Sequence, residues 1–327
     1  MADGTGIQWT DATWNPVRGC SRVSAGCDNC YAVGVAHRFS GPRQLYDGLT
    51  TIRRGKVDWA GMARLVPGAL DKPLRWKRPR RIFVNSMSDL FHESLSNEEI
   101  AAVFGVMAAC PQHTFQVLTK RPERMKKWFE WVTPNEDDTI YCAVDEGLTK
   151  SGFDIGQRAH LLRSWGNGTW PLPNVHLGVS VEDQKTADER IPLLLQTPAA
   201  VRFVSAEPLL GRLALSSFMP RHAVNEHGDC ANWCSACGPN EPKPRLDWVI
   251  VGGESGPGAR DCEVAWVRRV VSDCKAADVP VFVKQLGSDP IVEPGPISFP
   301  SSHKKGADMN EWPEDLRVRE FPEVSRG

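Results

Sequence analysis

Short apolar runs recur along the chain, and each is closed by polar residues or glycine. Runs that are rich in β-branched and aromatic residues and bounded in this way are typical of strands. We predict seven strands, near residues 7–9, 82–85, 114–119, 175–181, 201–205, 248–252 and 281–284. Several strands are followed by helical spacing, and this alternation favours an α/β fold with a parallel sheet.

Helical spacing is clearest in residues 97–109, where Ser96 has the character of an N-terminal cap and apolar residues recur on one face. We predict further helices over 121–131, 184–195 and 264–275. Units of this kind suit a partial or closed (β/α) barrel of about six to seven parallel strands. In such barrels the functional residues lie at the carboxyl ends of the strands.

The pattern predicts one barrel domain over residues 1–287, interrupted by two insertions. The first insertion covers about 134–173, and the second, at about 218–246, is rich in Cys, His, Asn and Pro. A proline-containing C-terminal extension, 288–327, follows, and we expect it to run over the surface.

The composition, with 41% hydrophobic and 24% charged residues, is typical of a soluble protein. Because no run approaches the roughly 18 apolar residues of a membrane span, and the N-terminus does not resemble a signal peptide, we expect a cytoplasmic protein with no membrane partner.

The net charge of −1 argues against general attraction to nucleic acid, so any such binding must be local. Residues 71–81 hold six cations and a tryptophan, a combination that suits phosphate contact and base stacking. A solvated charged face is the alternative. The candidate nucleic-acid contacts are Arg75, Trp76, Lys77, Arg78 and Arg80.

Six of the ten cysteines fall in two triplets, which without a secretory signal favours metal over disulfides. The first triplet, Cys20, Cys27 and Cys30, lies in WNPVRGCSRVSAGCDNCYA. Thiolates suit zinc or iron–sulfur clusters. Because closed zinc sites normally have four ligands, three cysteines favour a remote fourth ligand or a cluster with one open iron. A zinc-binding or structural loop is the alternative.

The string NPVRGC…GCDNCYA resembles the cluster-binding loop of spore photoproduct lyase-like radical S-adenosylmethionine (SAM) proteins, although its first cysteine spacing has six residues where that superfamily usually has three. NSMSDLFHE, LTKRPERM and SAEPLLG resemble strand-end segments of the same proteins, in the same order. The resemblance implies a 4Fe–4S cluster on Cys20, Cys27 and Cys30 with SAM at its open iron. Reductive cleavage of SAM would then yield a 5′-deoxyadenosyl radical that attacks a substrate.

Polar residues at the strand ends are candidates to contact this cosubstrate. The resemblance assigns the methionine moiety to Ser86, Ser88 and Asp89, although a polar capping loop would also explain them. By position at strand ends, the other candidate cofactor-binding residues are Thr119, Ser180, Glu182, Glu207, Gly252, Gly253 and Glu254, and the candidate catalytic residues are Lys120 and Lys284. Arg121 is a further cation at the third strand end. A weaker hypothesis is a divalent-metal nuclease that uses Asp89, His92 and Glu93.

The second triplet, Cys230, Cys234 and Cys237, has the C-x3-C-x2-C spacing of the radical enzymes but lies late in the chain, inside the second insertion. With His227 as the fourth ligand, and His222 also nearby, we predict a small zinc knuckle. A second cluster and unliganded thiols are the alternatives.

From GIQWTDATWNP through VSVEDQ, VGGESGPGAR and FVKQ, the chain also resembles an uncharacterised phage-associated family found beside three-cysteine-motif partner proteins. Together the resemblances imply a radical SAM enzyme that acts on a nucleic-acid base or nucleotide-like substrate, in modification or repair. They also imply a flavodoxin or ferredoxin as electron donor and a three-cysteine-motif protein as partner. The alternative is a non-catalytic zinc or iron–sulfur module that binds nucleic acid.

Overall fold

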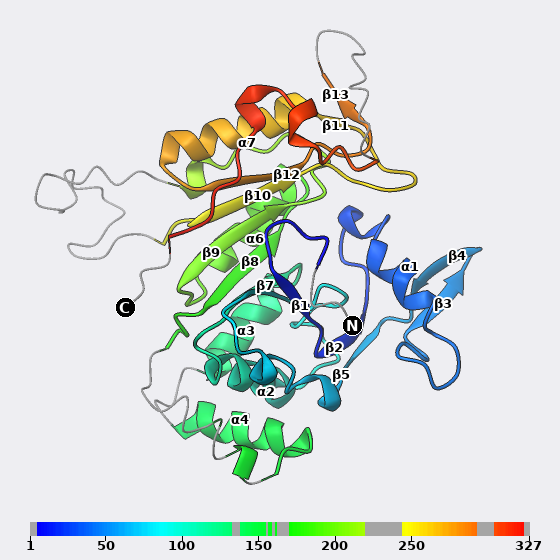
Figure 1. Cartoon of the computed structure of the whole chain (residues 1–327), viewed down its shortest axis with the longest axis vertical. Helices are drawn as coiled ribbons and strands as arrows, with labels where there is room; N and C mark the ends of the chain where they lie inside the picture. Colours follow the sequence, from blue (N-terminus) through cyan, green and yellow to red (C-terminus); the bar gives the residue numbers. More distant parts are fainter. Residues whose placement is uncertain are drawn as a thin grey trace, which may run out of the picture. The chain divides into compact units, whose positions relative to one another are not determined.

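The computed structural model describes residues 5–132, 138–154, 156–158, 161, 170–219, 244–292 and 304–323 (Figure 1). The chain forms two compact units. Unit 1 contains Met1–Ser180 and Thr197–Val201, and unit 2 contains Val181–Gln196 and Arg202–Gly327. No helix in the described ranges is long and apolar enough to cross a membrane.

Seven parallel strands form the main sheet, in the order β1-β6-β7-β8-β9-β10-β12. Their apolar residues are almost all buried, as expected for strands covered on both faces. The predicted partial barrel of parallel strands is therefore confirmed. The strands are β1 Ala12–Trp14, β6 Arg81–Val84, β7 Thr114–Thr119, β8 Val175–Ser180, β9 Val201–Ala206, β10 Trp248–Gly252 and β12 Val281–Gln285.

Six of the seven predicted strands are confirmed, but the first was placed too early. Residues 7–9 form a turn, and pairing with β6 begins where the Asp11 N–H donates to the Arg81 carbonyl at 2.9 Å. Trp9 is buried from this turn and packs on Phe83 of β6, so its apolar character reflects core packing outside a strand.

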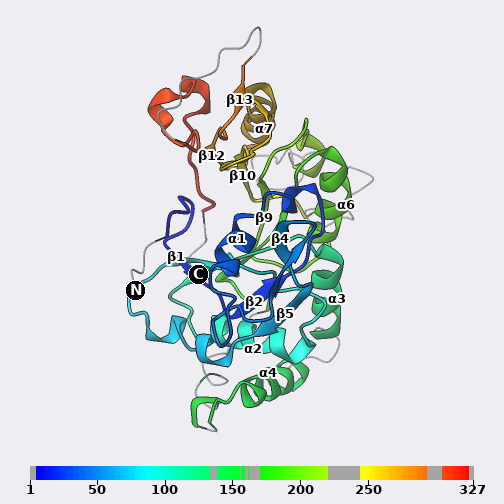
Figure 2. The same ribbon diagram turned by 90° about the vertical axis from the view of Figure 1, so that its right-hand side faces the viewer.

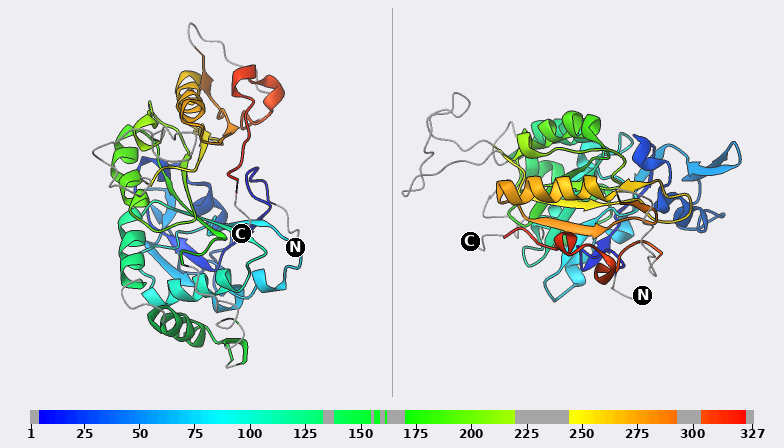
Figure 3. Two further views of the ribbon diagram at one scale, coloured as in Figure 1. Left: turned by 90° about the vertical axis from the view of Figure 1, so that its left-hand side faces the viewer. Right: turned by 90° about the horizontal axis from the view of Figure 1, so that it is seen from above.

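The predicted helices are confirmed. They are α2 Asn97–Ala108, α3 Pro122–Val132, α6 Gln184–Leu195 and α7 Val264–Ala277. Ser96 begins α2 with a capping box, because its hydroxyl accepts from the Glu99 N–H while the Glu99 carboxylate accepts from the Ser96 N–H. In unit 2, α7 packs along β10 and β12 (Figure 3).

The first predicted insertion contains a further helix, α4 Asp138–Lys150, which packs against α2. Gly147 permits this close approach, since a Cβ there would lie 2.1 Å from the Glu98 carbonyl oxygen. The second insertion lies mostly outside the described residues. Its described ends meet, because the Leu246 N–H donates to the Phe218 carbonyl at 3.2 Å.

We expected the C-terminal extension to run over the surface, but part of it packs into unit 2. Within the described residues of this segment, Trp312 and Leu316 are buried in unit 2. The Val283 N–H of β12 donates to the Val318 carbonyl at 2.9 Å, so the segment covers an edge of the sheet. A two-residue strand, β13 Pro290–Ile291, also pairs with β11 Cys262–Glu263.

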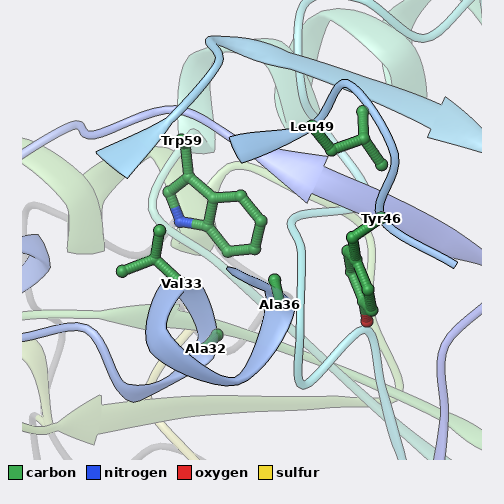
Figure 4. Packing of buried hydrophobic residues seen from close by; sticks show 6 residues of the cluster. All are labelled: Ala32, Val33, Ala36, Tyr46, Leu49 and Trp59. Atoms are coloured by element: carbon green, nitrogen blue, oxygen red, sulfur yellow. The ribbon is translucent and has the colours of Figure 1, made fainter. Parts of the chain in front are cut away.

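Between β1 and β6, the chain forms elements that we did not predict. Strand β2 Val17–Cys20 pairs antiparallel with β5 Met62–Leu65. Helix α1 Tyr31–His37 packs on a hairpin of β3 Thr50–Arg53 and β4 Lys56–Trp59 (Figure 2). We call residues 31–64 the helix–hairpin module. Figure 4 shows its small core, which consists of Ala32, Val33, Ala36, Tyr46, Leu49 and Trp59.

Candidate functional site

The first cysteine triplet lies on one loop of unit 1. Cys20 ends β2, Cys27 closes the 3-10 turn Ala25–Cys27, and Cys30 precedes α1. All three are free thiols. Gly19 fixes the start of the loop, because its φ is +88° and a Cβ would lie 2.3 Å from the Met62 carbonyl oxygen of β5.

Two of the cysteines contact the core of the helix–hairpin module. Cys20 and Cys30 both pack against it. Burial, followed by the charge of the nearby Asp89 carboxylate, raises the pKa of the Cys20 thiol to about 12, while Arg121 acts in the opposite direction. Without a metal, Cys20 is therefore protonated at neutral pH, and binding as a thiolate would release this proton.

Ser86 and Ser88, predicted to bind cofactor, connect the end of β6 to the segment that leads into the cysteine loop. The Ser86 hydroxyl donates to Asn15 Oδ1 at 3.2 Å, and the Ser88 hydroxyl donates to the Val17 carbonyl at 2.9 Å. The Tyr31 hydroxyl, directly after Cys30, donates to the Ser86 carbonyl at 2.7 Å. The loop is thus attached to β6 before and after the cysteines.

Asp89 accepts several hydrogen bonds from the end of β7. Its carboxylate accepts from the Thr119 hydroxyl at 2.7 Å, the Lys120 N–H at 3.1 Å and Arg121 Nη1 at 3.0 Å. Asp89, Thr119 and Arg121 are all buried. Asp89 and Thr119 were predicted separately as cofactor-binding residues of two strand ends, and the structure shows that they bond to each other.

Arg121 connects this strand end to the cysteine loop. Its Nη2 donates to the Ser21 hydroxyl at 2.7 Å, its Nε donates to Glu93 at 3.0 Å, and its Nη1 lies 4.0 Å from Cys20 Sγ. Burial acts to lower the pKa of Arg121, but Asp89, Cys20 and Glu93 raise it above its usual value. A cation at this strand end is visible in the sequence, but its central position among these partners was not predicted.

His92 holds Ser21 from the other side. Its Nδ1 accepts from the Ser94 N–H at 3.1 Å, so in neutral imidazole the proton lies on Nε2, which donates to the Ser21 hydroxyl at 3.0 Å. Burial, followed by the charge of Arg121, lowers the pKa of His92. Glu93 and Asp89 both bind Arg121, so a divalent metal held by Asp89, His92 and Glu93 would have to compete with these ion pairs.

Lys120 and Ser180 were predicted from different strand ends, and the structure brings them together. Lys120 Nζ, after β7, donates to the Ser180 hydroxyl at the end of β8, at 2.9 Å. Both residues belong to unit 1. This cation at the carboxyl end of the sheet is suited to an anionic group such as a carboxylate or phosphate.

Unit 2 holds the other predicted strand-end residues. Lys284 Nζ lies 2.9 Å from Glu207 Oε1, and the Ser205 hydroxyl donates to the same carboxylate at 3.2 Å. A Cβ at Gly252 would lie 2.9 Å from Glu207 Oε1, and one at Gly253 would lie 2.4 Å from a backbone oxygen. The two glycines are thus explained by close packing, whether or not a ligand binds there.

The other two carboxylates of unit 2 that were predicted to bind cofactor are each paired with an arginine of that unit. Glu254 accepts from Arg260 Nη2 at 2.6 Å and from Arg260 Nε at 2.9 Å. Glu182 is buried and accepts from Arg190 Nη1 at 3.2 Å. A cosubstrate contact by either carboxylate stays a prediction and would have to compete with these ion pairs.

The first triplet offers three free thiols on one loop, a donor set that suits an iron–sulfur cluster with one open iron. Among the described residues, no three His, Cys, Asp or Glu side chains are placed to hold one metal ion. Each cysteine of a cluster binds a different iron, so its ligands need not converge on one point. Three free thiols on one loop, with Arg121 beside Cys20 to offset thiolate charge, meet this requirement. The second triplet, Cys230, Cys234 and Cys237 with His227, lies outside the described residues.

In the basic segment 71–81, Trp76 is not available for base stacking. The ring is buried, with Lys72 Nζ 5.1 Å and Arg80 Cζ 5.0 Å from its centroid and the His113 ring at its edge. This part of the prediction was wrong, because the tryptophan packs into unit 1. Phosphate contacts by the exposed Lys77 and Arg78 stay a prediction.

Residues 4–311 match the sequence model of a family described as "Protein of unknown function (DUF5131)". No curated protein and no solved structure matches the chain.

Proposed function

The chain belongs to this family, DUF5131, and we propose that it is a radical SAM enzyme with a 4Fe–4S cluster on Cys20, Cys27 and Cys30. Its substrate would be a nucleic-acid base or nucleotide-like molecule, and its electron donor a flavodoxin or ferredoxin. The observation that carries the proposal is the buried connection from the cysteine loop, through Ser21 and Arg121, to the end of β7. Cosubstrate-binding residues are expected at such strand ends.

When bound, the cluster would supply the electron that cleaves SAM. The chain's own residues position the loop and control its charge. Arg121 brings a permanent positive charge close to Cys20, which favours the thiolate that a metal requires. Ser86, Ser88 and Tyr31 fix the loop to β6, so that the thiols are held in place before a cluster binds.

Lys120 is the residue that we assign to the cosubstrate carboxylate. Its backbone N–H is held by Asp89 and its Nζ by Ser180, so the side chain has a defined position at the carboxyl end of the sheet. A charge-assisted hydrogen bond to a carboxylate is stronger than the bond to a neutral hydroxyl that it would replace.

The test is anaerobic purification with iron, sulfide and zinc analysis, followed by addition of SAM and dithionite and measurement of 5′-deoxyadenosine. We expect about four irons per chain and SAM cleavage, both lost in Cys27→Ala. Cys142→Ala is the matched control, because Cys142 is also a free thiol but is exposed on α4. Zinc alone, without cleavage after cluster reconstitution, would refute the proposal and favour the non-catalytic binding module.

A further inference from the structure

The helix–hairpin module carries most of the exposed apolar surface of unit 1. In the part of the chain that the structure describes, six large hydrophobic residues are exposed. One of them, Val23, belongs to the cysteine loop. The other five lie in the module, and the exposed fraction of each residue is between 48% and 63%: Tyr31, Phe39, Leu45, Ile52 and Met62. Single exposed apolar residues are ordinary, whereas five within one module of 34 residues make that module the candidate binding surface of unit 1.

The same module is basic. Residues 31–64 contain five arginines and one lysine against two aspartates, a net charge of +4 in a chain of net charge −1. Asp58 is bound by Arg22, which lies outside the module, at 2.8 Å. Asp47 accepts from the Arg43 backbone N–H at 2.9 Å. The two carboxylates of the module are thus fewer than its six cations, and Asp58, whose pKa the charge of Arg53 also lowers, is already bound by Arg22.

The hairpin places cations next to apolar side chains. In its register Thr50 is opposite Trp59 and Ile52 is opposite Val57, so one face changes from buried Trp59 to exposed Ile52 toward the tip. The next pair, Arg53 and Lys56, flanks a turn formed by Arg54 and Gly55, both with positive φ. The tip thus presents three exposed cations, Arg53, Arg54 and Lys56, beside the end of an apolar face.

Helix α1 presents a similar combination. Ala32, Val33 and Ala36 face the module core, which leaves Tyr31 and Arg38 exposed on the outer face, two turns apart. Phe39 follows directly and is also exposed. Because Tyr31 is adjacent to Cys30, this aromatic and basic surface begins at the cysteine loop.

We propose that the helix–hairpin module binds single-stranded nucleic acid, with bases stacked on Tyr31 and Phe39 and phosphates on the cations of the hairpin tip. Aromatic rings interleaved with cations are the pattern that binds unpaired strands, whereas the bases of a duplex are not free to stack on them. The predominance of arginine favours phosphate, which its planar fork binds bidentately. The role of this strand as a substrate rests on the proposed function, but its binding does not.

The electrostatic part is tested by fluorescence anisotropy of the full chain with a labelled single-stranded oligonucleotide across a salt series. In Arg53→Gln/Arg54→Asn/Lys56→Gln we expect affinity to fall at least about tenfold and the slope of log K against log salt to decrease by about 2, since each phosphate contact contributes about 0.7. The matched control, Lys126→Gln/Lys127→Gln/Lys150→Gln, removes three cations from α3 and α4 and should leave both values unchanged.

The stacking part is tested by Phe39→Ala, whose side chain is half exposed. We expect affinity to fall about tenfold with an unchanged salt slope, a combination that loss of charge would not produce. Equal weakening by both triple variants, equal affinity for a duplex, or equally tight binding of polyglutamate would overturn the proposal.

The same samples separate the two proposals. The hairpin triple variant should cleave SAM as the unmodified protein does when no nucleic acid is present. Strand binding without any SAM cleavage would refute the proposed enzyme and leave the binding surface standing. SAM cleavage without strand binding would refute the binding surface and leave the proposed enzyme standing.

Discussion

The strand ends of the two units carry similar residues that perform different structural tasks. In unit 1 the ion pair of Asp89 and Arg121 is buried, with side-chain exposures of 7% and 5%, and extends to the cysteine loop. In unit 2 the pair of Glu207 and Lys284 is less buried, at 13% and 23%, and connects the ends of β9 and β12. A charged residue after a strand can therefore fix a neighbouring loop or only join strands.

The largest expected effect is at Arg121. Arg121→Met keeps an unbranched side chain of similar length but leaves the buried Asp89 carboxylate without its ion pair, so we expect the free energy of unfolding of unit 1 to fall by about 3–5 kcal/mol. Urea denaturation measures the loss, and hydrogen exchange should localise it to residues 20–30 and 85–93. Unchanged exchange in the cysteine loop would show that Arg121 does not hold it.

A smaller effect is expected for the equivalent change in unit 2. Lys284→Met removes the cation from a partly exposed pair whose carboxylate retains the Ser205 hydroxyl, so the loss should be about 1 kcal/mol or less. The same denaturation and exchange measurements apply, with the change confined to β9 and β12. A loss as large as that of Arg121→Met would contradict the distinction between the two ends.

The smallest effect is a pH dependence that only one strand end should show. Since burial lowers the folded-state pKa of His92, the unfolded chain binds a proton more readily, and stability present above about pH 6.5 is lost as the pH falls toward the folded value. Protonation at Nδ1 would also break the bond from Ser94. Measured relative to the intrinsic exchange rate at each pH, the protection of residues 20–30 should therefore decrease at acid pH, and in His92→Asn this decrease should disappear.

The described part of unit 2 contains no histidine, so we expect no comparable loss of protection near Glu207 and Lys284 between about pH 6.5 and the folded-state pKa of His92. Burial also lowers the pKa values of His113 and His176 in unit 1, the latter to about 4. Their protonation would affect the strands β7 and β8, and this effect can be told apart from that of His92 because it persists in His92→Asn. A loss of protection at acid pH that is equal throughout unit 1 would contradict a local role for His92.

Most of the sheet could be predicted from the sequence, because strands buried on both faces leave continuous apolar runs such as Trp248–Gly252. The helix–hairpin module could not, since its strands have only one buried face and are four residues long. The cysteine loop was recognisable because its chemistry lies in neighbouring residues. The position of Arg121 was not, because its partners Ser21 and Asp89 are distant in sequence and a buried arginine has no signal that distinguishes it from an exposed one.

The packing of residues 304–323 against β12 has a consequence for the limits of the domain. The match to the family ends at residue 311. The buried Trp312 follows directly, and the buried Leu316 and the Val318 carbonyl that pairs with β12 lie further along the chain. A chain shortened to the matched residues would expose unpaired N–H and C=O groups along β12. Exposed strand edges of this kind pair with other molecules, so self-association would then replace a contact that the full chain makes within itself.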